Sequence, residues 1–542
     1  MEPEIKVDQP FIGNNYQPRR KMIMLVITLL ISISVIVIML IVFSSIKKEK
    51  QVPKKNSDND NKEIEKENEK EKEKEKEKEK EKEKEKEKEK EKEKEKEKEK
   101  EKEKEKEKEK EKEKEKGKDL CEIGEEEKCL TCEEGKDTCE SCNPGYKLSD
   151  GKCKLNYSFK ATYKTESINE KVELIKNFGE YDIVETIING ENVGSCKDYT
   201  FIESGKHTVY YLLNLNEHKD LTKMFYGLTK LKTISFTSLF DSENVGIMEQ
   251  MFSGCTSLTS INLSALNTGN VKKMGGMFRG CEKIKSLDLS NLDTSKVTDM
   301  SFMFSSCYSL ESVNLENINT DNVLSMNNMF SGCYSLQSLD LSSFNTENVE
   351  DMSRMFFNDI SLKELKLTKF DTSSVKDMSS MFDGCSGLKS LNLYNFNTKN
   401  VENMNNMFYK CSNLTSIDLS KFDTSKVTNM ASMFAYCSKL PSLELDSFET
   451  DKLYNMEYMF SYCLSLTSID LSNFNTENVT SMTGLFYGCE ALDKIDISSF
   501  TSSSNRNISI FRDLPESGTL KVNEDFVDLI KKELPDDWKI KN

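Results

Sequence analysis

Cysteine is the residue type in this chain that can take part in the widest range of chemistry. The spacing of the sixteen cysteines separates two groups and one single residue. Six lie close together before residue 155, nine recur on a period of 26 residues from Cys255 to Cys489, and Cys196 stands alone. Closely spaced cysteines bind zinc or form disulfides, whereas single cysteines on a long period are typical of one repeated structural position.

The clustered group contains two C-x2-C pairs, and six residues lie between Cys132 and Cys139. Zinc ribbons usually leave about a dozen or more residues between such pairs, so disulfides are favoured over zinc. A segment this short has almost no apolar core and needs covalent links. We predict a disulfide module over residues 117–155, no cofactor, and no pairing fixed by spacing alone. The disulfide candidates are Cys121, Cys129, Cys132, Cys139, Cys142 and Cys153.

The periodic group defines a repeat. Its unit is L-x2-[LI]-x-L-x2-[FL]-[ND]-T-x2-V-x2-M-x2-M-F-x-G-C, and Asp359 stands in the one slot that lacks cysteine. Alternating leucines predict a short strand buried on one side, while Val349, Met352, Met355 and Phe356 recur at the spacing of a helix. We predict an α/β solenoid over residues 223–504, with a parallel sheet backed by short helices. The Asn or Asp before Thr is expected to cap each helix.

The methionine and cysteine columns could also indicate a metal or redox site. Both fall on positions that must face the core, so packing explains them better. Stacked cysteine side chains point in parallel and not at one another, which predicts buried free thiols.

The repeat resembles the leucine-rich repeat family, and its M-x2-M-F-x-G-C signature and 26-residue length are similar to the BspA-like surface proteins. That resemblance implies a surface protein for adhesion or recognition. The segment that begins Cys142-Asn-Pro-Gly-Tyr-Lys-Leu resembles the cysteine-rich modules of furin-like and growth-factor-receptor proteins.

The N-terminal region contains an apolar run of 25 residues, 22–46, long enough for a transmembrane helix and too long for a cleaved signal peptide. We predict a cytoplasmic tail over 1–21, a signal-anchor helix, a polar linker over 47–68, and a low-complexity Glu-Lys stalk, helix or coil, over 69–116. The flanking lysines favour a cytoplasmic C-terminal side, but the disulfide module requires the outside. We therefore expect a single-pass plasma-membrane protein with an extracellular C-terminal region.

Two caps are expected to close the array. Residues 156–222 alternate apolar and polar side chains and predict a β-rich N-terminal cap. Residues 505–542 form the C-terminal cap, in which 520–534 is predicted to form one amphipathic helix and Trp538 to be a packing residue. The two histidines, His207 and His218, are expected on the surface.

Strand residues between the leucines should point away from the core. This outer face is polar and mostly acidic, which indicates a ligand face for a basic protein, a glycan or divalent cations; a solvated strand surface explains it equally well. The ten candidates are Asn262, Asp288, Asn314, Asp340, Lys366, Asn392, Asp418, Glu444, Asp470 and Asp496.

The sequence lacks the motifs of common enzyme classes. It has no Ser-His-Asp set, no phosphate-binding loop and no H-E-x2-H motif, so we predict that it is not an enzyme. The net charge of −17 argues against nucleic acid as a partner. We expect a membrane-anchored adhesion or recognition protein with a protein or glycan ligand. The alternatives are a structural coat or antigen without a ligand, or an intracellular scaffold if the topology is reversed; the oligomeric state is left open.

Overall fold

The computed structural model describes residues 129–132, 139–142, 146–149, 152–178, 182–215, 218–501 and 509–541. The predicted tail, transmembrane helix at 22–46, linker and stalk at 69–116 lie outside these residues. Among the residues described, no helix combines the length and apolar character needed to cross a membrane.

Two small antiparallel ribbons come first. Strand β1 (Cys129–Cys132) pairs with β2 (Cys139–Cys142), and β3 (Tyr146–Ser149) pairs with β4 (Lys152–Leu155). A disulfide between Cys142 and Cys153, with the two Cα atoms 5.6 Å apart, joins β2 to β4. The covalent link holds together two ribbons that have little apolar core of their own.

The segment after these ribbons is β-rich. One sheet has the order β12-β11-β5-β10-β7-β8, in which β5 pairs antiparallel with β11, the first strand of the repeats, so the sheet runs from this segment into the array. Phe159 and Tyr211 are fully buried and stack with ring centroids 5.0 Å apart. The strands are β5 (Phe159–Thr165), β6 (Glu170–Glu173), β7 (Ile183–Ile188), β8 (Glu191–Gly194), β9 (Asp198–Phe201) and β10 (Gly205–Leu213).

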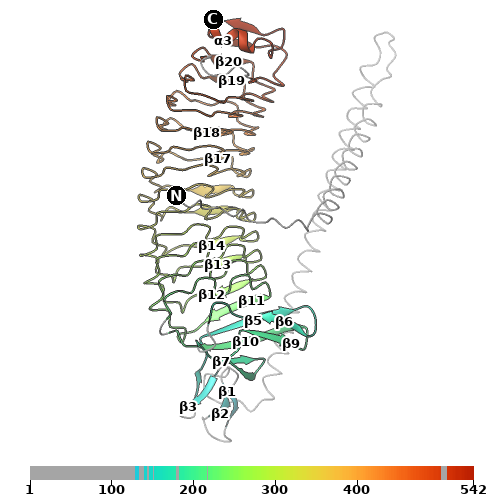
Figure 1. Ribbon diagram of the computed structural model, residues 1–542, viewed down its shortest axis with the longest axis vertical. Coiled ribbons are helices and arrows are strands. Elements are labelled where there is room, and N and C mark those ends of the chain that lie inside the picture. The colour runs from blue at the N-terminus through green and yellow to red at the C-terminus, as the bar shows by residue number, and fades with distance from the viewer. Residues whose placement is uncertain are drawn as a thin grey trace, which may run out of the picture. The chain divides into compact units, whose positions relative to one another are not determined.

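Each 26-residue repeat forms one coil, and the coils stack with their strands parallel (Figure 1). The expected parallel arrangement is therefore present, but strands of two to four residues pair mainly two by two, as β13 with β14 and β15 with β16. The strands are β11 (Leu231–Phe236), β12 (Ser260–Asn262), β13 (Ser286–Asp288), β14 (Ser312–Asn314), β15 (Ser338–Asp340), β16 (Glu364–Lys366), β17 (Ser390–Leu391), β18 (Ser416–Ile417), β19 (Ser468–Asp470) and β20 (Lys494–Ile497).

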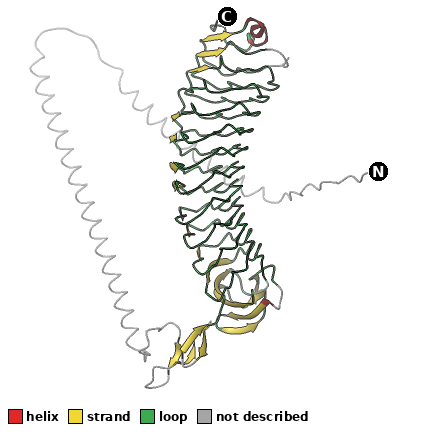
Figure 2. Ribbon diagram, turned by 90° about the vertical axis from the view of Figure 1, so that its left-hand side faces the viewer, coloured by secondary structure: helices red, strands yellow, loops and turns green. Residues whose placement is uncertain are grey.

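The predicted short helices of the repeats are wrong. Between residues 218 and 501 the Val-Met-Met-Phe segments are consecutive turns, which Figure 2 draws as loops. Gln250 and Gly254 have φ angles of 53° and 74°, and the same two positions are left-handed in coil after coil. An α-helix requires negative φ throughout, so it cannot run through a residue of this conformation every fourth position.

Backbone hydrogen bonds explain why turns replace helix. Alternate amides of the turn segment donate to the next coil: Met248 N to Lys273 O and Phe252 N to Met277 O, both at 2.9 Å. The amides between them close turns within the coil, as Ser253 N does to Gln250 O at 3.0 Å. Half of the donors thus join neighbouring coils, as in a parallel sheet, and these links recur along the whole array.

The core lies between the turn segments and the strands. The predicted core residues Val349, Met352, Met355 and Phe356 are all fully buried. Phenylalanines of neighbouring coils stack in a column, with Phe252 and Phe278 centred 5.7 Å apart and nearly parallel. The helical spacing of these residues therefore identified the buried side chains correctly even though the backbone is not helical.

The C-terminal segment adds two more parallel strands and differs from the expected single helix. Strand β21 (Thr519–Val522) pairs with β20, and β22 (Lys539–Lys541) pairs with β21. Helix α3 (Glu524–Ile530) covers only seven residues and begins after Asn523, whose side chain accepts from Asp525 N. Leu520 and Val522 alternate inward on the strand, so the helix starts later than predicted. Trp538 is mostly buried, and its Nε1 donates to Pro515 O.

Candidate recognition face of the repeat array

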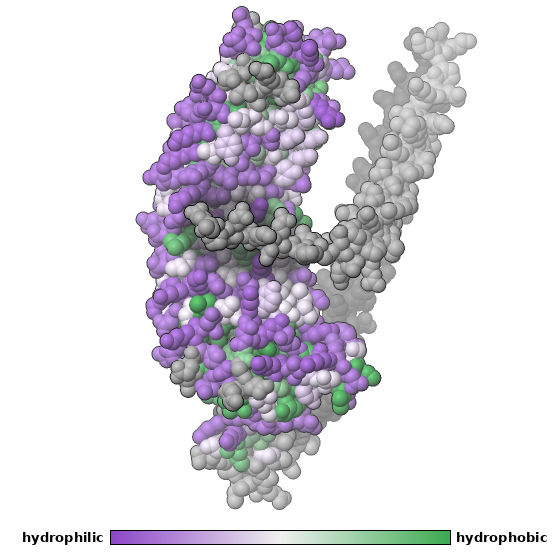
Figure 3. Space-filling model, viewed as in Figure 1, coloured by the Kyte–Doolittle hydropathy of each residue, from purple (hydrophilic) through white to green (hydrophobic). Residues whose placement is uncertain are grey.

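The ten residues proposed as a ligand face form one column across the strands, which we call the outer sheet face. Nine of them are exposed, and Asp496 is half-buried. Each stands between two inward-facing positions of its strand, as Asp288 does between Leu287 and Leu289, which are buried. Residue alternation therefore brings the ten candidates together on one side of the array, as expected for side chains of parallel strands. In Figure 3, hydrophilic side chains cover most of the visible part of the coils.

Most side chains of this column also have a structural task. One oxygen of the Asp or Asn accepts a hydrogen bond from the backbone amide two residues later, which fixes the turn after the strand. Asp418 accepts from Ser420 N at 3.0 Å and Asp470 from Ser472 N at 2.9 Å. The same bond forms at Asn262, Asp288, Asn314, Asp340, Asn392 and Asp496. Glu444 is the acidic residue of the column for which no such bond is described.

The first part of the column is partly neutralised by contacts between coils. Asn314 Nδ2 donates to Asp288 Oδ1 at 2.9 Å, and Lys366 Nζ lies 2.8 Å from Asp340 Oδ2. The hydrogen bond from Lys366, with those from Ser342, lowers the pKa of Asp340 to about 2. At the far end, Lys521 Nζ lies 2.9 Å from Asp496 Oδ2.

Three consecutive coils between these pairs carry carboxylates that form no ion pair with a side chain of another coil among the described residues: Asp418, Glu444 and Asp470. Adjacent coils are about 4.8 Å apart, so the three like charges stand near one another in a row. The described residues contain no group of three His, Cys, Asp or Glu side chains suited to hold a metal ion. The row is therefore a locally negative, solvent-facing surface.

The nine periodic cysteines contribute nothing to this surface. All nine are free and buried, and each thiol whose bond is described donates to a phenylalanine carbonyl of the preceding coil, as Cys281 does to Phe252 O. Burial raises the pKa of these thiols, to about 12 at Cys307. A raised pKa keeps a thiol protonated and unreactive.

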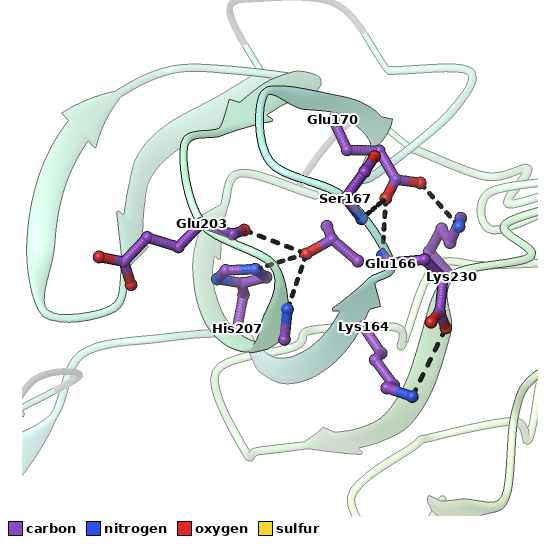
Figure 4. A network of polar contacts seen from close by, with 9 residues as sticks. Lys164, Glu166, Ser167, Glu170, Glu203, His207 and Lys230 are labelled. Carbon is purple, nitrogen blue, oxygen red and sulfur yellow. Dashed lines mark hydrogen bonds and ion pairs between the residues drawn. The ribbon is translucent and has the colours of Figure 1, made fainter.

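One of the two histidines, His207, differs from the predicted surface position. His207 is buried, and its Nε2 lies 2.9 Å from Thr165 Oγ1 (Figure 4). Its ring stacks on Phe201. His218 is partly exposed and pairs with Asp182. The alternating strand β10 carries His207 inward, which the alternation of the neighbouring Val209 and Tyr211 could have indicated.

Figure 4 also shows a second polar network, which the sequence did not predict. Glu170 accepts hydrogen bonds from the amides of Glu166 and Ser167, and Lys230 Nζ lies 2.6 Å from its carboxylate. The Lys230 ammonium is the largest of these influences, which together lower the pKa of Glu170 to about 2. The network ties the turn before β6 to the first repeat, so its role is structural.

Comparison with known proteins gives family matches over the repeats. The family described as "Mycoplasma protein of unknown function, DUF285" matches residues 219–339, 325–440 and 411–516. "BspA type Leucine rich repeat region (6 copies)" matches residues 155–269. No curated protein matches.

Two solved structures are similar at low identity. A leucine-rich repeat protein from Bacteroides ovatus is 20% identical, with 64% of this chain and 88% of that chain covered and a TM-score of 0.33. A complex named TLR13-ssRNA13 is 14% identical, with 58% of this chain and 68% of that chain covered and a TM-score of 0.12.

The DUF285 matches together extend over residues 219–516, which is more than half of the chain, and the BspA-type match joins them at the first repeats. The chain therefore belongs to the family described as Mycoplasma protein of unknown function, DUF285, and its repeats are leucine-rich repeats of the BspA type.

Proposed function

We propose that this chain is a membrane-anchored cell-surface protein whose repeat array recognises a basic protein partner through the outer sheet face. A leucine-rich-repeat array with two closed ends is a scaffold for binding, because its exposed strand residues can vary without disturbing the core. The apolar run 22–46 is the proposed anchor and the Glu-Lys segment 69–116 the spacer. The Cys142–Cys153 disulfide supports an extracellular position for the residues C-terminal to the anchor.

The observation that carries the proposal is the row of Asp418, Glu444 and Asp470. Like charges on adjacent strands repel one another, and the array accepts this cost without placing a lysine between them. A cationic surface of a partner would relieve the repulsion and gain complementary charge contacts. Lys366 and Lys521 lie on either side of the row, so positive charge bounds the negative surface at both ends. These two lysines would repel a cationic partner and so fix its position along the array.

The test is a triple variant, D418N/E444Q/D470N. Asparagine keeps the Oδ1 acceptor that Asp418 and Asp470 use for their turns, so the fold should be preserved while three charges are lost. Exposed charge pairs contribute about 0.2–1 kcal/mol each, so affinity for a poly-L-lysine peptide should fall roughly three- to hundredfold.

The matched control removes three exposed carboxylates outside the strands: E347Q/E402Q/E490Q. It changes the net charge by the same amount and should leave most of the affinity intact. Equal losses in the two triple variants would mean that total charge, and not the outer sheet face, attracts the peptide. No loss in either would favour the structural coat without a specific ligand.

A further inference from the structure

A second surface of the array is hollowed where the turn segment leads into the next strand. The hollow has a volume of about 420 Å³ and extends over five consecutive coils. Its floor is made by small residues on either side of the buried cysteine column: Gly384 before it, and Ser386, Ser412 and Ser438 after it. This volume lies within the range of about 300–1,000 Å³ that ligand sites occupy.

The hollow is a gap in an apolar ridge. The residue after the cysteine position is large and more than a third exposed in Tyr308, Tyr334 and Ile360, and again in Leu464. Tyr308 and Tyr334 stack with ring centroids 4.9 Å apart, so side chains of adjacent coils are in contact along this ridge. Three serines replace the large residues in the coils between Ile360 and Leu464, so these two side chains stand four coil spacings apart, or roughly 19 Å.

The hollow carries one cation and no lining carboxylate. Lys410 Nζ lies 4.9 Å from the ring centroid of Tyr409 and 5.9 Å from that of Tyr436, and no ion pair to it is found among the described residues. Asp383 of the preceding coil faces both Lys410 and Arg354 and is mostly buried, and burial raises its pKa to about 6. Two cations thus face one carboxylate, so on a chain of net charge −17 this is a locally positive site, with the Lys410 ammonium held over aromatic rings.

We propose that the hollow binds an acidic polypeptide segment, with aliphatic side chains between Ile360 and Leu464 and a carboxylate on Lys410. Exposed tyrosines are residues on which protein interfaces concentrate their affinity, and the exposed Ile360 and Leu464 add apolar area at the two ends of the hollow. The hollow is separate from the outer sheet face. Its positive charge favours an acidic partner, whereas the outer sheet face is proposed to bind a basic one.

The hollow is poorly suited to a sugar chain or to an added strand. Tyr436 and Tyr462 stack on each other at 4.7 Å, and Tyr462 also lies against Gly488, so ring faces for sugar stacking are already covered. Ser386 and Ser438 hydroxyls donate to carbonyls of the preceding coil. The Gly384 amide donates to Tyr409 O at 2.7 Å, so it is not available to pair with an added strand.

The experiment measures binding of a fluorescent peptide of alternating leucine and glutamate to the full chain. Ser412→Trp fills the hollow without breaking a described side-chain hydrogen bond and should weaken binding at least about tenfold. Lys410→Met removes the cation and should weaken it about two- to fivefold. A peptide with lysine in place of glutamate should bind more weakly than the acidic peptide.

Two controls separate this site from a general surface effect and from the proposed function. Thr256→Trp places the same ring in the same column six coils away and should leave affinity unchanged. D418N/E444Q/D470N should not reduce binding of the acidic peptide. Undiminished binding to Ser412→Trp would overturn the proposal, as would equal affinity for the lysine peptide or stronger binding of a sialylated oligosaccharide.

Discussion

Asp359 is the residue at which this array departs most clearly from its own pattern. It occupies the cysteine slot and is fully buried, and its Oδ1 accepts from Cys333 N at 2.7 Å. Its Oδ2 has no hydrogen-bond partner. Burial is the largest influence on this carboxyl and raises its pKa well above the ordinary value. The neutral acid is therefore the form that suits the site.

Replacing Asp359 by cysteine should stabilise the array near pH 7. The pKa of Asp359 is higher in the folded than in the unfolded protein. The free energy of unfolding is therefore not reduced by this carboxyl below the unfolded pKa of about 4, and it falls as pH rises toward the folded pKa. Relieving a buried unsatisfied group is worth about 1–3 kcal/mol. Thermal unfolding of wild type and Asp359→Cys should therefore differ more at pH 7 than at pH 4.

Asp359→Asn is the matched control for this prediction. It keeps an oxygen for the Cys333 amide but does not ionise, so it should remove the same pH dependence. If the difference between wild type and Asp359→Cys is the same at both pH values, the carboxyl of Asp359 does not titrate as the burial implies.

At the scale of elements, the Asn or Asp before each Thr was expected to cap a helix, but no helix follows it among the described coils, and the threonine itself joins neighbouring coils. Thr398 is buried, its Oγ1 donates to Asp423 O at 2.8 Å and accepts from Asp423 N at 2.8 Å. The bond to the next coil recurs from Thr268 through Thr450. The Asn or Asp before each Thr instead closes a turn, as Asp423 Oδ1 does with Ser425 N. The regular spacing of these residues along the array thus serves contacts between coils.

Thr398→Val should destabilise the array by about 1–3 kcal/mol, because it leaves a backbone amide and a carbonyl of the next coil unpaired. The exposed Thr368→Val makes the same chemical change where no side-chain hydrogen bond is described, and should stay within about 0.5 kcal/mol. Chemical denaturation of the two variants measures the difference. Equal effects would show that the threonine column does not join the coils.

The two groups of cysteines should behave differently in one measurement. Mass spectrometry after alkylation of the native protein without reductant should find Cys142 linked to Cys153 and the nine periodic cysteines unmodified. Those nine are buried with raised pKa values, so little reactive thiolate exists before unfolding. Alkylation of the periodic cysteines in the folded protein, or a disulfide between two of them, would contradict this arrangement.

For the whole molecule, the proposal requires the region after residue 117 to be outside the cell. Protease added to intact cells should then release or degrade the repeat array, whereas a cytoplasmic array is protected by the membrane. The control is the same digestion after permeabilisation, which exposes both sides. Protection of the array until the cells are permeabilised would reverse the topology and favour the intracellular scaffold.

The sequence by itself determined the repeat length, the parallel stacking and the identity of the core. These depend on local spacing, because a residue that recurs every 26 positions must occupy the same place in each coil. It also placed the ten residues of the outer sheet face on one side, since alternation along a strand is a local property. The family matches over 155–269 and 219–516 agree with that repeat.

Only the tertiary structure decided the backbone between the strands. Val349, Met352 and Met355 would be buried by a helix or by stacked turns alike, and the choice depends on hydrogen bonds to the next coil that lie about 26 residues away in sequence. The same holds for the burial of His207 and for the hollow at Ser412, which exists because three coils place small side chains side by side. Each depends on a neighbour distant in sequence, which local periodicity does not identify.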